Sequence, residues 1–252
     1  MEVWAVLIGN ALTVGLDKAV YLGELPATGW HRHAAPVLLV GLSGRFRLRW
    51  PDGRSEHCHS ALIDAGVEHV FDPDGERVAI LYLEPDAPEV QRLRVLFAQR
   101  GPVVGEPLSR VVDRWHTEQR LNHFDLDALI DRRLWPSLQP VDARVLRSLR
   151  HLRDAGLPSM PDREALARTV HLSSSRFNHL FSEEAGVSFR SYRVWSQVRR
   201  ALAAYRPDGS LTDAALDGAF ADSAHFSRMF RSTFGMTPSS VLKPLRSVTV
   251  LR

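Results

Sequence analysis

Three histidines in the first third of the chain have the residue type and spacing to bind a metal ion. His31 and His33 are two positions apart, so their side chains share one face if this segment is a strand. His69 follows in Ala65-Gly66-Val67-Glu68-His69. Three neutral imidazoles can coordinate a divalent metal. His57 and His59 form a weaker pair of the same kind, with the Cys58 thiol on the opposite strand face.

No other set of side chains predicts catalysis. The sequence has no glycine-rich phosphate loop, no serine nucleophile motif and no defensible carboxylate pair. Aromatic side chains in the same half could instead line an apolar ligand pocket, although aromatic residues between strands usually belong to the core. The predicted pocket residues are Trp30, His31, His33, Phe46 and His69. The sequence does not identify the ligand.

Two segments near the C-terminal end, 49 positions apart, repeat one pattern. Residues 165–189 and 214–238 each run from a short alanine-containing helix through a break into a second helix. Ser173 and Asp222 are the expected N-caps, and Gly186 and Gly235 the expected helix ends. Between them, apolar residues fall at i, i+3 and i+4: Phe177, Leu180 and Phe181, then Phe226, Met229 and Phe230. This pattern predicts two helix-turn-helix motifs, because the repeat preserves cap, apolar triplet and glycine together.

The opposite face of each second helix carries short polar and basic residues. Such side chains suit the reading of base edges in a DNA major groove. The alternative is a pair of ordinary amphipathic hairpins with solvated faces, and the in-register repeat argues against it. The predicted reading residues are Ser174, Ser175, Asn178 and His179 in the first copy, and Ser223, His225, Ser227 and Arg228 in the second.

Residues 142–243 resemble the DNA-binding domain of the AraC/XylS family of bacterial transcriptional regulators. The second copy carries the more specific match, through Phe220, Asp222, Ser223, Phe226, Ser227, Arg228, Phe230, Phe234, Gly235, Thr237 and Pro238. Between the copies, Phe189, Tyr192, Val198, Ala201 and Leu202 resemble the connecting helix. The sequence departs from the family pattern at Ala219 (usually glycine), Gln197 (frequently arginine), His225 (commonly aromatic), and Val241 and Leu242 (usually Tyr-Arg).

The resemblance implies a sequence-specific transcription regulator that is not an enzyme and has no cofactor. Its expected partners are double-stranded DNA, an unidentified small-molecule effector and RNA polymerase, with no membrane. The expected phosphate contacts are Arg176, Arg190, Arg193, Arg199, Arg200 and Arg231. The sequence leaves open a monomer or a homodimer, and activation or repression.

Charge divides the chain in the same place. Residues 140–252 contain 17 Lys and Arg against 10 Asp and Glu, a net of +7. Residues 1–139 contain 15 against 19, a net of −4. A basic half joined to a mildly acidic half is typical of a nucleic-acid-binding module fused to a separate module.

The N-terminal half is predicted to be a β-structure. Strands are expected at 18–24, 37–41, 44–50, 55–63 and 77–84, with an earlier strand in the first fourteen residues. The segment 41–48 resembles the turn and strand of a cupin barrel. The metal-binding cupin pattern, however, has a glutamate soon after the histidine pair and an asparagine after the later histidine. Neither is present here, so the sequence favours a protein without a metal. The alternative is a metal-dependent cupin enzyme or a metal sensor fused to a DNA-binding domain.

The expected fold class is α+β, with an N-terminal cupin-like β-barrel, a helical extension and a C-terminal all-α tandem helix-turn-helix domain. The expected boundaries are 1–85 for the barrel, 86–135 for the extension, 136–141 for a linker, 142–243 for the DNA-binding domain and 244–252 for a tail. In the extension, apolar stripes at Leu108, Val111, Val112 and Trp115, and at Leu126, Leu129, Ile130 and Leu134, indicate helices that dimerise or pack on the barrel. A third alternative is a ligand-independent protein whose barrel only dimerises.

A single cysteine, Cys58, excludes an intramolecular disulfide and fits a reducing compartment. No apolar run approaches the roughly 18 residues of a membrane span. The first residues lack the basic cluster of a signal peptide. We therefore expect a cytoplasmic protein.

Overall fold

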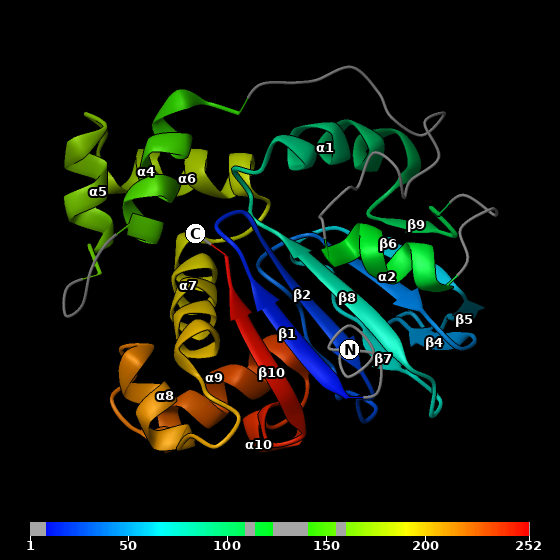
Figure 1. Cartoon of the computed structure of the whole chain (residues 1–252). Helices are drawn as coiled ribbons and strands as arrows, with labels where there is room; N and C mark the ends of the chain where they lie inside the picture. Colours follow the sequence, from blue (N-terminus) through cyan, green and yellow to red (C-terminus); the bar gives the residue numbers. More distant parts are fainter. Residues whose placement is uncertain (1–8, 109–113, 123–140, 155–159, 252) are drawn as a thin grey trace.

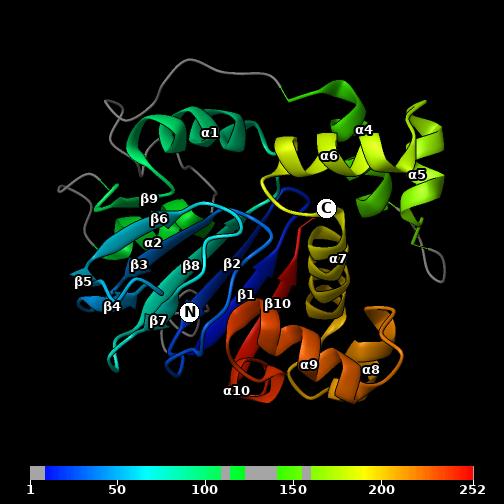
Figure 2. The same cartoon turned by 180° about the vertical axis from the view of Figure 1, so that it is seen from behind.

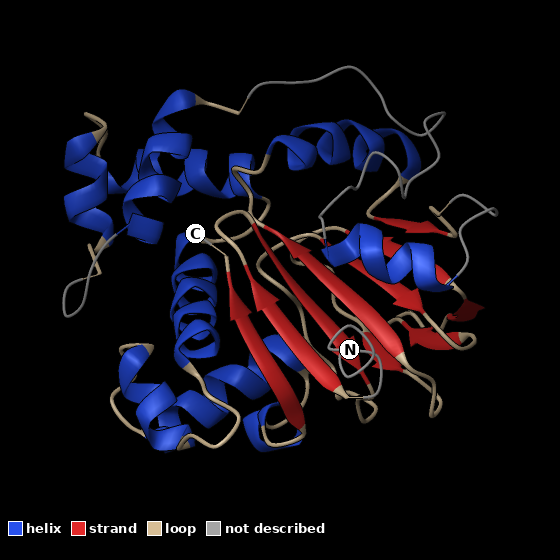
Figure 3. Cartoon of the chain, viewed as in Figure 1, coloured by secondary structure: helices blue, strands red, loops and turns tan. Residues whose placement is uncertain are grey.

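The computed structural model describes residues 9–108, 114–122, 141–154 and 160–251. Strands gather on one side of the molecule and the C-terminal helices on the other (Figures 1 and 3). In chain order the elements are β1 (Asn10–Val14), β2 (Lys18–Gly23), β3 (Val37–Gly41), β4 (Phe46–Arg49), β5 (Ser55–Cys58), β6 (Ser60–Ile63), β7 (Val70–Asp72), β8 (Val78–Leu83), α1 (Pro88–Arg100), β9 (Val103–Gly105), α2 (Arg114–Asn122), α4 (Ala143–Asp154), α5 (Arg163–Thr169), α6 (Ser174–Ala185), α7 (Phe189–Ala204), α8 (Leu211–Asp217), α9 (Ser223–Phe234), α10 (Pro238–Leu242) and β10 (Leu245–Val250).

The strands form two sheets. The larger has the order β10-β1-β2-β8-β3-β6-β9, and the smaller has the order β5-β4-β7. Neighbouring strands pair antiparallel, except that β10 pairs parallel with β1. The α+β class is therefore confirmed, but the strands of the described residues do not close into a single barrel. The N-terminal half is better described as two sheets with a common core.

Both faces of the larger sheet are buried, as the alternation of side chains along each strand requires. On one face, Leu38 and Leu81 pack with the apolar residues of α1, including Leu93. On the other face, Leu39 and Ile80 share a core with the smaller sheet and with helices α7 and α9. The C-terminal helical half is therefore packed against the sheet rather than separated from it.

The predicted strands correspond closely to β2, β3, β4 and β8. The expected strand 55–63 is divided at His59 into β5 and β6, which belong to different sheets. Three strands were not expected. They are β7, β9 inside the segment predicted to be helical, and β10 inside the segment predicted to be a tail.

A buried carboxylate joins the sheet to α7. Glu84, directly after β8, accepts hydrogen bonds from the hydroxyl of Tyr192 and from Nε1 of Trp195, each at 2.7 Å. Its Oε1 also lies 3.0 Å from Nη1 of Arg199. Because a buried charge requires a partner, this cluster specifies how α7 sits on the sheet.

Several expectations fall on residues that lie outside the described ones. They are the linker residues 136–140 and the stripe residues Val111, Val112, Leu126, Leu129, Ile130 and Leu134. The surroundings of Trp115 are likewise not described. Among the described helices, none combines the length and hydropathy needed to cross a membrane.

Candidate nucleic-acid interface and histidine cluster

Helix α6 begins and ends where its sequence predicts. The Ser173 hydroxyl accepts a hydrogen bond from the backbone N–H of Arg176, which satisfies a free amide of the first turn. Gly186 ends the helix with φ 74°, a left-handed conformation that favours glycine. Phe177 and Phe181 are buried, so the opposite face of α6 is left to solvent.

Helix α9 repeats this construction. Asp222 accepts from the backbone N–H of His225, and Gly235 ends the helix with φ 70°. Phe226 and Phe230 are buried, as are their counterparts in α6. Both predicted caps, both apolar faces and both terminal glycines are confirmed.

The predicted reading residues lie on the faces away from these phenylalanines. In α6, Ser175 and His179 are exposed, and Ser174 and Asn178 are half-buried. In α9, Ser223 and Arg228 are exposed, while His225 and Ser227 are half-buried. The His225 ring lies edge-on against Phe220, with ring centroids 5.4 Å apart. The polar side chains needed for base contacts therefore reach the surface in both helices.

Two of the departures from the family pattern, Ala219 in the turn before α9 and Gln197 in α7, contact each other. Ala219 has φ 58°, the left-handed region in which glycine is preferred. The carbonyl oxygen of Ala219 accepts a hydrogen bond from Nε2 of Gln197 at 2.8 Å. Gln197 thus stabilises the turn from the connecting helix.

One predicted phosphate contact is wrong. Arg199 is 9% exposed, pairs with Glu84, and donates to the backbone carbonyls of Gly15 and Leu16. A guanidinium held in this way cannot reach a DNA backbone. Arg193 and Arg200 are half-buried, whereas Arg176, Arg190 and Arg231 are exposed.

Helices α6 and α9 lie at opposite ends of α7, in both views of the molecule (Figures 1 and 2). α7 carries buried residues along its whole length, from Phe189 to Leu202. One continuous, well-packed helix therefore sets the separation of the two reading helices.

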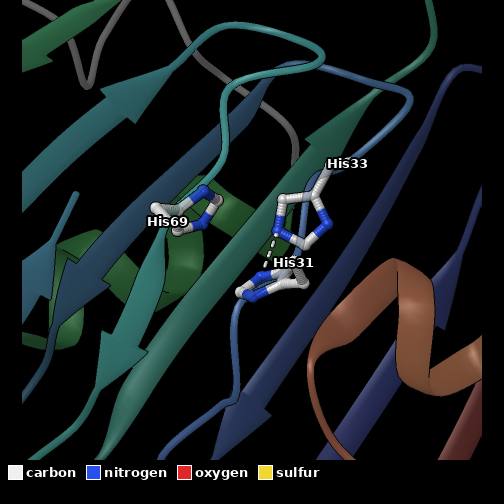
Figure 4. Close-up of side chains that lie close together, drawn as sticks. All are labelled: His31, His33 and His69. Carbon is white, nitrogen blue, oxygen red and sulfur yellow. Dashed lines mark hydrogen bonds between the residues drawn. The ribbon is translucent and has the colours of Figure 1, made fainter. Parts of the chain in front are cut away.

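The three histidines converge (Figure 4). His31, His33 and His69 are 4%, 4% and 1% exposed, and a potential ligand atom of each lies within 4.8 Å of the other two. Nε2 of His31 is 3.1 Å from Nε2 of His33. The backbones of His31 and His69 are paired by two hydrogen bonds, which bring together segments 38 positions apart in the chain.

Burial keeps these imidazoles neutral. Loss of water around His31, with His69 nearby, lowers the pKa of His31 to about 3. Burial and the two neighbouring rings lower the pKa of His33 well below its ordinary value, and burial lowers that of His69. The neutral ring is the form that binds metal.

Trp30 and Phe46 do not take the predicted place in a pocket with the histidines. The Trp30 side chain is 51% exposed. Phe46 is fully buried on β4, where its ring packs edge-on against Phe71 with centroids 5.1 Å apart. Phe46 is therefore a core residue, and only the histidines come together.

The sequence did not predict the side chains at the contact between the sheets and helices α7 and α9, which we call the joint. Glu84 is an isolated acidic residue at the end of an apolar strand, and no local pattern marks its partners on α7. A cavity of about 350 Å³ lies in the same joint and is lined by Arg32, His33, Ala34, Gly66, Val187, Arg190, Ser191, Val194, Met229, Ser232 and Thr233.

Comparison with known proteins identifies the helical half. Residues 166–244 match the family model described as "Helix-turn-helix domain". The arabinose operon regulatory protein of Salmonella typhimurium is 31% identical over 113 residues, and that of Escherichia coli K12 is 31% identical over 101 residues. These residues form an AraC-type helix-turn-helix domain.

The AraC-type domain is the shared part. The two matches span 44% and 40% of this chain, and 39% and 35% of the relatives' own lengths. A crystal structure of ToxT from Vibrio cholerae extends the similarity to the whole fold, with a TM-score of 0.58 over 91% of this chain and 99% of that one. At 11% identity, this likeness concerns the fold alone.

Proposed function

We propose that this chain is a sequence-specific DNA-binding transcription regulator whose activity responds to a small molecule bound in its N-terminal half. The observation that carries the proposal is the pair of capped helices, α6 and α9, with exposed polar faces at the two ends of α7 inside an AraC-type domain. The arabinose operon regulators share this domain. RNA polymerase as a partner and a cytoplasmic location belong to the same proposal.

In this proposal the two helices enter successive major grooves, about 34 Å apart on one face of the DNA. Asn178 and His179 in α6, and His225 and Arg228 in α9, read base edges together with the serines beside them. Exposed arginines such as Arg176, Arg190 and Arg231 contact phosphates and supply most of the affinity. Arg199 is excluded from this set because it is buried against Glu84.

The joint between sheet and helices is the proposed effector site. The cavity of about 350 Å³ is lined both by sheet-side loops and by residues of α7 and α9. One of the ToxT structures is of a form bound to an unsaturated fatty acid, which supports a small-molecule site in this fold. An effector bound here would change activity by favouring one arrangement of the two halves.

Fluorescence anisotropy of the full chain with labelled duplex DNA, over a salt series, tests the proposal. We expect the logarithm of the association constant to fall linearly with the logarithm of the salt concentration, because the basic half displaces condensed counterions. Absence of binding at low salt, or binding that does not change with salt, would reject it. A metal-dependent enzyme tethered to DNA would still pass this test. Such an enzyme would be distinguished by its turnover of a substrate. The similarity to arabinose operon regulatory proteins favours a regulator without catalytic activity.

A further inference from the structure

Two members of the histidine cluster, His31 and His69, have the tautomers of metal ligands. A backbone carbonyl only accepts hydrogen bonds, so Nδ1–H of His31 donates to the oxygen of Gly29, and Nδ1–H of His69 donates to that of Val67, each at 3.0 Å. In a neutral ring this leaves Nε2 of both histidines without a proton. Fixing the outer nitrogen on a carbonyl is the usual way in which proteins orient a metal-binding histidine.

Hydrogen bonds among the three rings do not give every buried ring nitrogen a partner. Because Nε2 of His31 carries no proton, Nε2–H of His33 donates the hydrogen bond between these two rings, and this proton must leave Nε2 before His33 can bind a metal through that atom. Among the described residues, Nε2 of His69 is buried without a hydrogen-bond partner. Buried polar atoms are normally paired, so an unpaired, unprotonated nitrogen facing two other imidazoles points to an absent ligand.

The spacing of the rings fits a transition metal. Bonds of about 2.0–2.1 Å in a tetrahedral zinc site place two ligand nitrogens about 3.3–3.4 Å apart. The two Nε2 atoms of His31 and His33 are 3.1 Å apart, and the third ligand atom lies within 4.8 Å. A small inward movement of the His69 loop completes the set. Three histidines leave a fourth position for water or an exogenous ligand, which compensates for the glutamate absent from the sequence.

The two loops that supply the histidines also contact the C-terminal ends of α6 and α9. The first loop, between β2 and β3, carries His31 and His33, and the second, between β6 and β7, carries His69. In the first loop, Gly29 donates its N–H to the carbonyl of Gly235, the residue that ends α9, at 2.7 Å. A side chain at Gly235 would clash with this loop, including Nδ1 of His31. The His33 ring also packs near Phe234, at a centroid distance of 5.8 Å.

The second loop makes the corresponding contact with α6. Gly66 lies against the carbonyl of Gly186, the residue that ends α6, and against Val187. Gly66 also donates its N–H to the carbonyl of His33, which ties this loop to the first one. The histidines thus lie where the two loops meet, and each loop contacts one reading helix.

We propose that His31, His33 and His69 bind one divalent transition-metal ion of the zinc type, and that the bound ion couples the positions of α6 and α9. His33 also lines the cavity of about 350 Å³, which gives the ion a path from solvent. The coupling half of the proposal rests on the proposed DNA-binding function, whereas the metal site does not.

Zinc titration of the full chain, after dialysis against a chelator, tests the site. We expect one zinc per chain by calorimetry and by elemental analysis. Because each histidine is itself a proposed ligand, binding in His69→Gln and His31→Gln should weaken by more than the roughly 10–100-fold that losing a residue hydrogen-bonded to a ligand costs. Exposed His59→Gln is the matched control and should bind as the wild type does; it also tests the His57/His59 pair. Circular dichroism checks that each variant is folded, and His33→Gln serves as an independent third variant. Zinc-free wild type, or equal binding in all histidine variants, would overturn the site.

Hydrogen exchange tests the coupling without DNA. Zinc should slow amide exchange around both Gly186 and Gly235 in the wild type, and should not do so in His69→Gln. Zinc should also change the affinity for duplex DNA in the wild type but not in that variant. Zinc binding with unchanged exchange and unchanged DNA affinity would overturn the coupling. Loss of all DNA binding with zinc binding intact would instead reject the proposed function alone.

Discussion

Arg228 lies on the exposed face of α9, opposite buried Phe226 and Phe230. If its guanidinium makes a bidentate contact with guanine, Arg228→Ala should weaken binding to the specific site by about 1–3 kcal/mol. Binding to scrambled DNA should change much less. A competition assay measures both, with exposed Arg54→Ala, at the turn between β4 and β5, as the control. An equal loss for every sequence would make Arg228 a phosphate contact and remove it from the reading set.

Ala219 adopts φ 58°, which costs an L-residue about 1–2 kcal/mol relative to the right-handed region. Ala219→Gly should therefore raise the free energy of unfolding by about 1 kcal/mol, although glycine also adds entropy to the unfolded chain. Urea denaturation measures the effect. Ala221→Gly, at an ordinary backbone conformation two residues later, should lower stability instead. A loss of stability in Ala219→Gly would show that the left-handed turn is not strained.

Asp64 gives stability a pH dependence. Burial raises the pKa of its carboxyl from 3.8 to about 6, against an opposing hydrogen bond from the backbone of Ala65. Between these two pKa values the folded protein keeps a proton that the unfolded chain releases. The contribution of Asp64 to the free energy of unfolding is therefore complete below about pH 4 and is lost as the pH rises through about 6. Relative to Asp64→Asn, the wild type should lose up to about 3 kcal/mol over that window.

Denaturation of both proteins at several pH values checks this result. Asp52→Asn is the control of opposite sign, because hydrogen bonds from Arg54 lower the pKa of exposed Asp52. The wild type should gain stability relative to that variant as the pH rises through the acid range. A difference between wild type and Asp64→Asn that is independent of pH would contradict the assignment.

At the scale of elements, the contact between β8 and α7 depends on Glu84. Removing this carboxylate leaves Arg199 buried without its counter-charge and leaves Tyr192 and Trp195 without an acceptor. Glu84→Ala should cost about 3–5 kcal/mol of unfolding free energy. Exposed Glu56→Ala, on β5, should change it little. Calorimetry that finds Glu84→Ala as stable as the wild type would show that the two halves do not depend on this cluster.

Elements set by local chemistry could be predicted from the sequence. The caps Ser173 and Asp222, and the glycines at 186 and 235, act within one helical turn, so their residue types suffice. β10 could not be predicted in the same way, because its pairing with β1 joins the two ends of the chain. Val248, Thr249 and Val250 are a β-branched signal that the short length of the segment concealed.

The residues of the site also separate into those set by local sequence and those set by contacts between distant parts of the chain. The polar faces of α6 and α9 follow from helical periodicity alone, which places Arg228 opposite Phe226. The burial of Arg199 does not follow from periodicity, because its partner Glu84 is 115 positions away in the chain. The convergence of His69 with His31 likewise depends on a backbone pairing between distant loops. The sequence therefore argued against a metal, because the glutamate and asparagine of the metal-binding cupin pattern are missing. The proposed metal site depends instead on the convergence of the three buried histidines, which only the structure shows.

At the scale of the whole molecule, α7 connects α6 with α9 and is itself packed on the N-terminal sheets through Glu84. In the proposed function, this contact is the route by which a ligand bound at the sheets would act on the helix that separates α6 from α9. In the proposed function, the basic charge of residues 140–252 supplies attraction to DNA of any sequence, and the polar faces of α6 and α9 supply the discrimination.

Selection of binding sites by the full chain from a random duplex library, followed by footprinting of the selected DNA, tests the central claim most directly. The selected site should contain two preferred segments about one helical turn, or 34 Å, apart on one face. Asn178→Ala with His179→Ala should relax one segment only, and His225→Ala with Arg228→Ala should relax the other. A site with a single preferred segment, or no enrichment of any sequence, would contradict the account of two reading helices on one connecting helix.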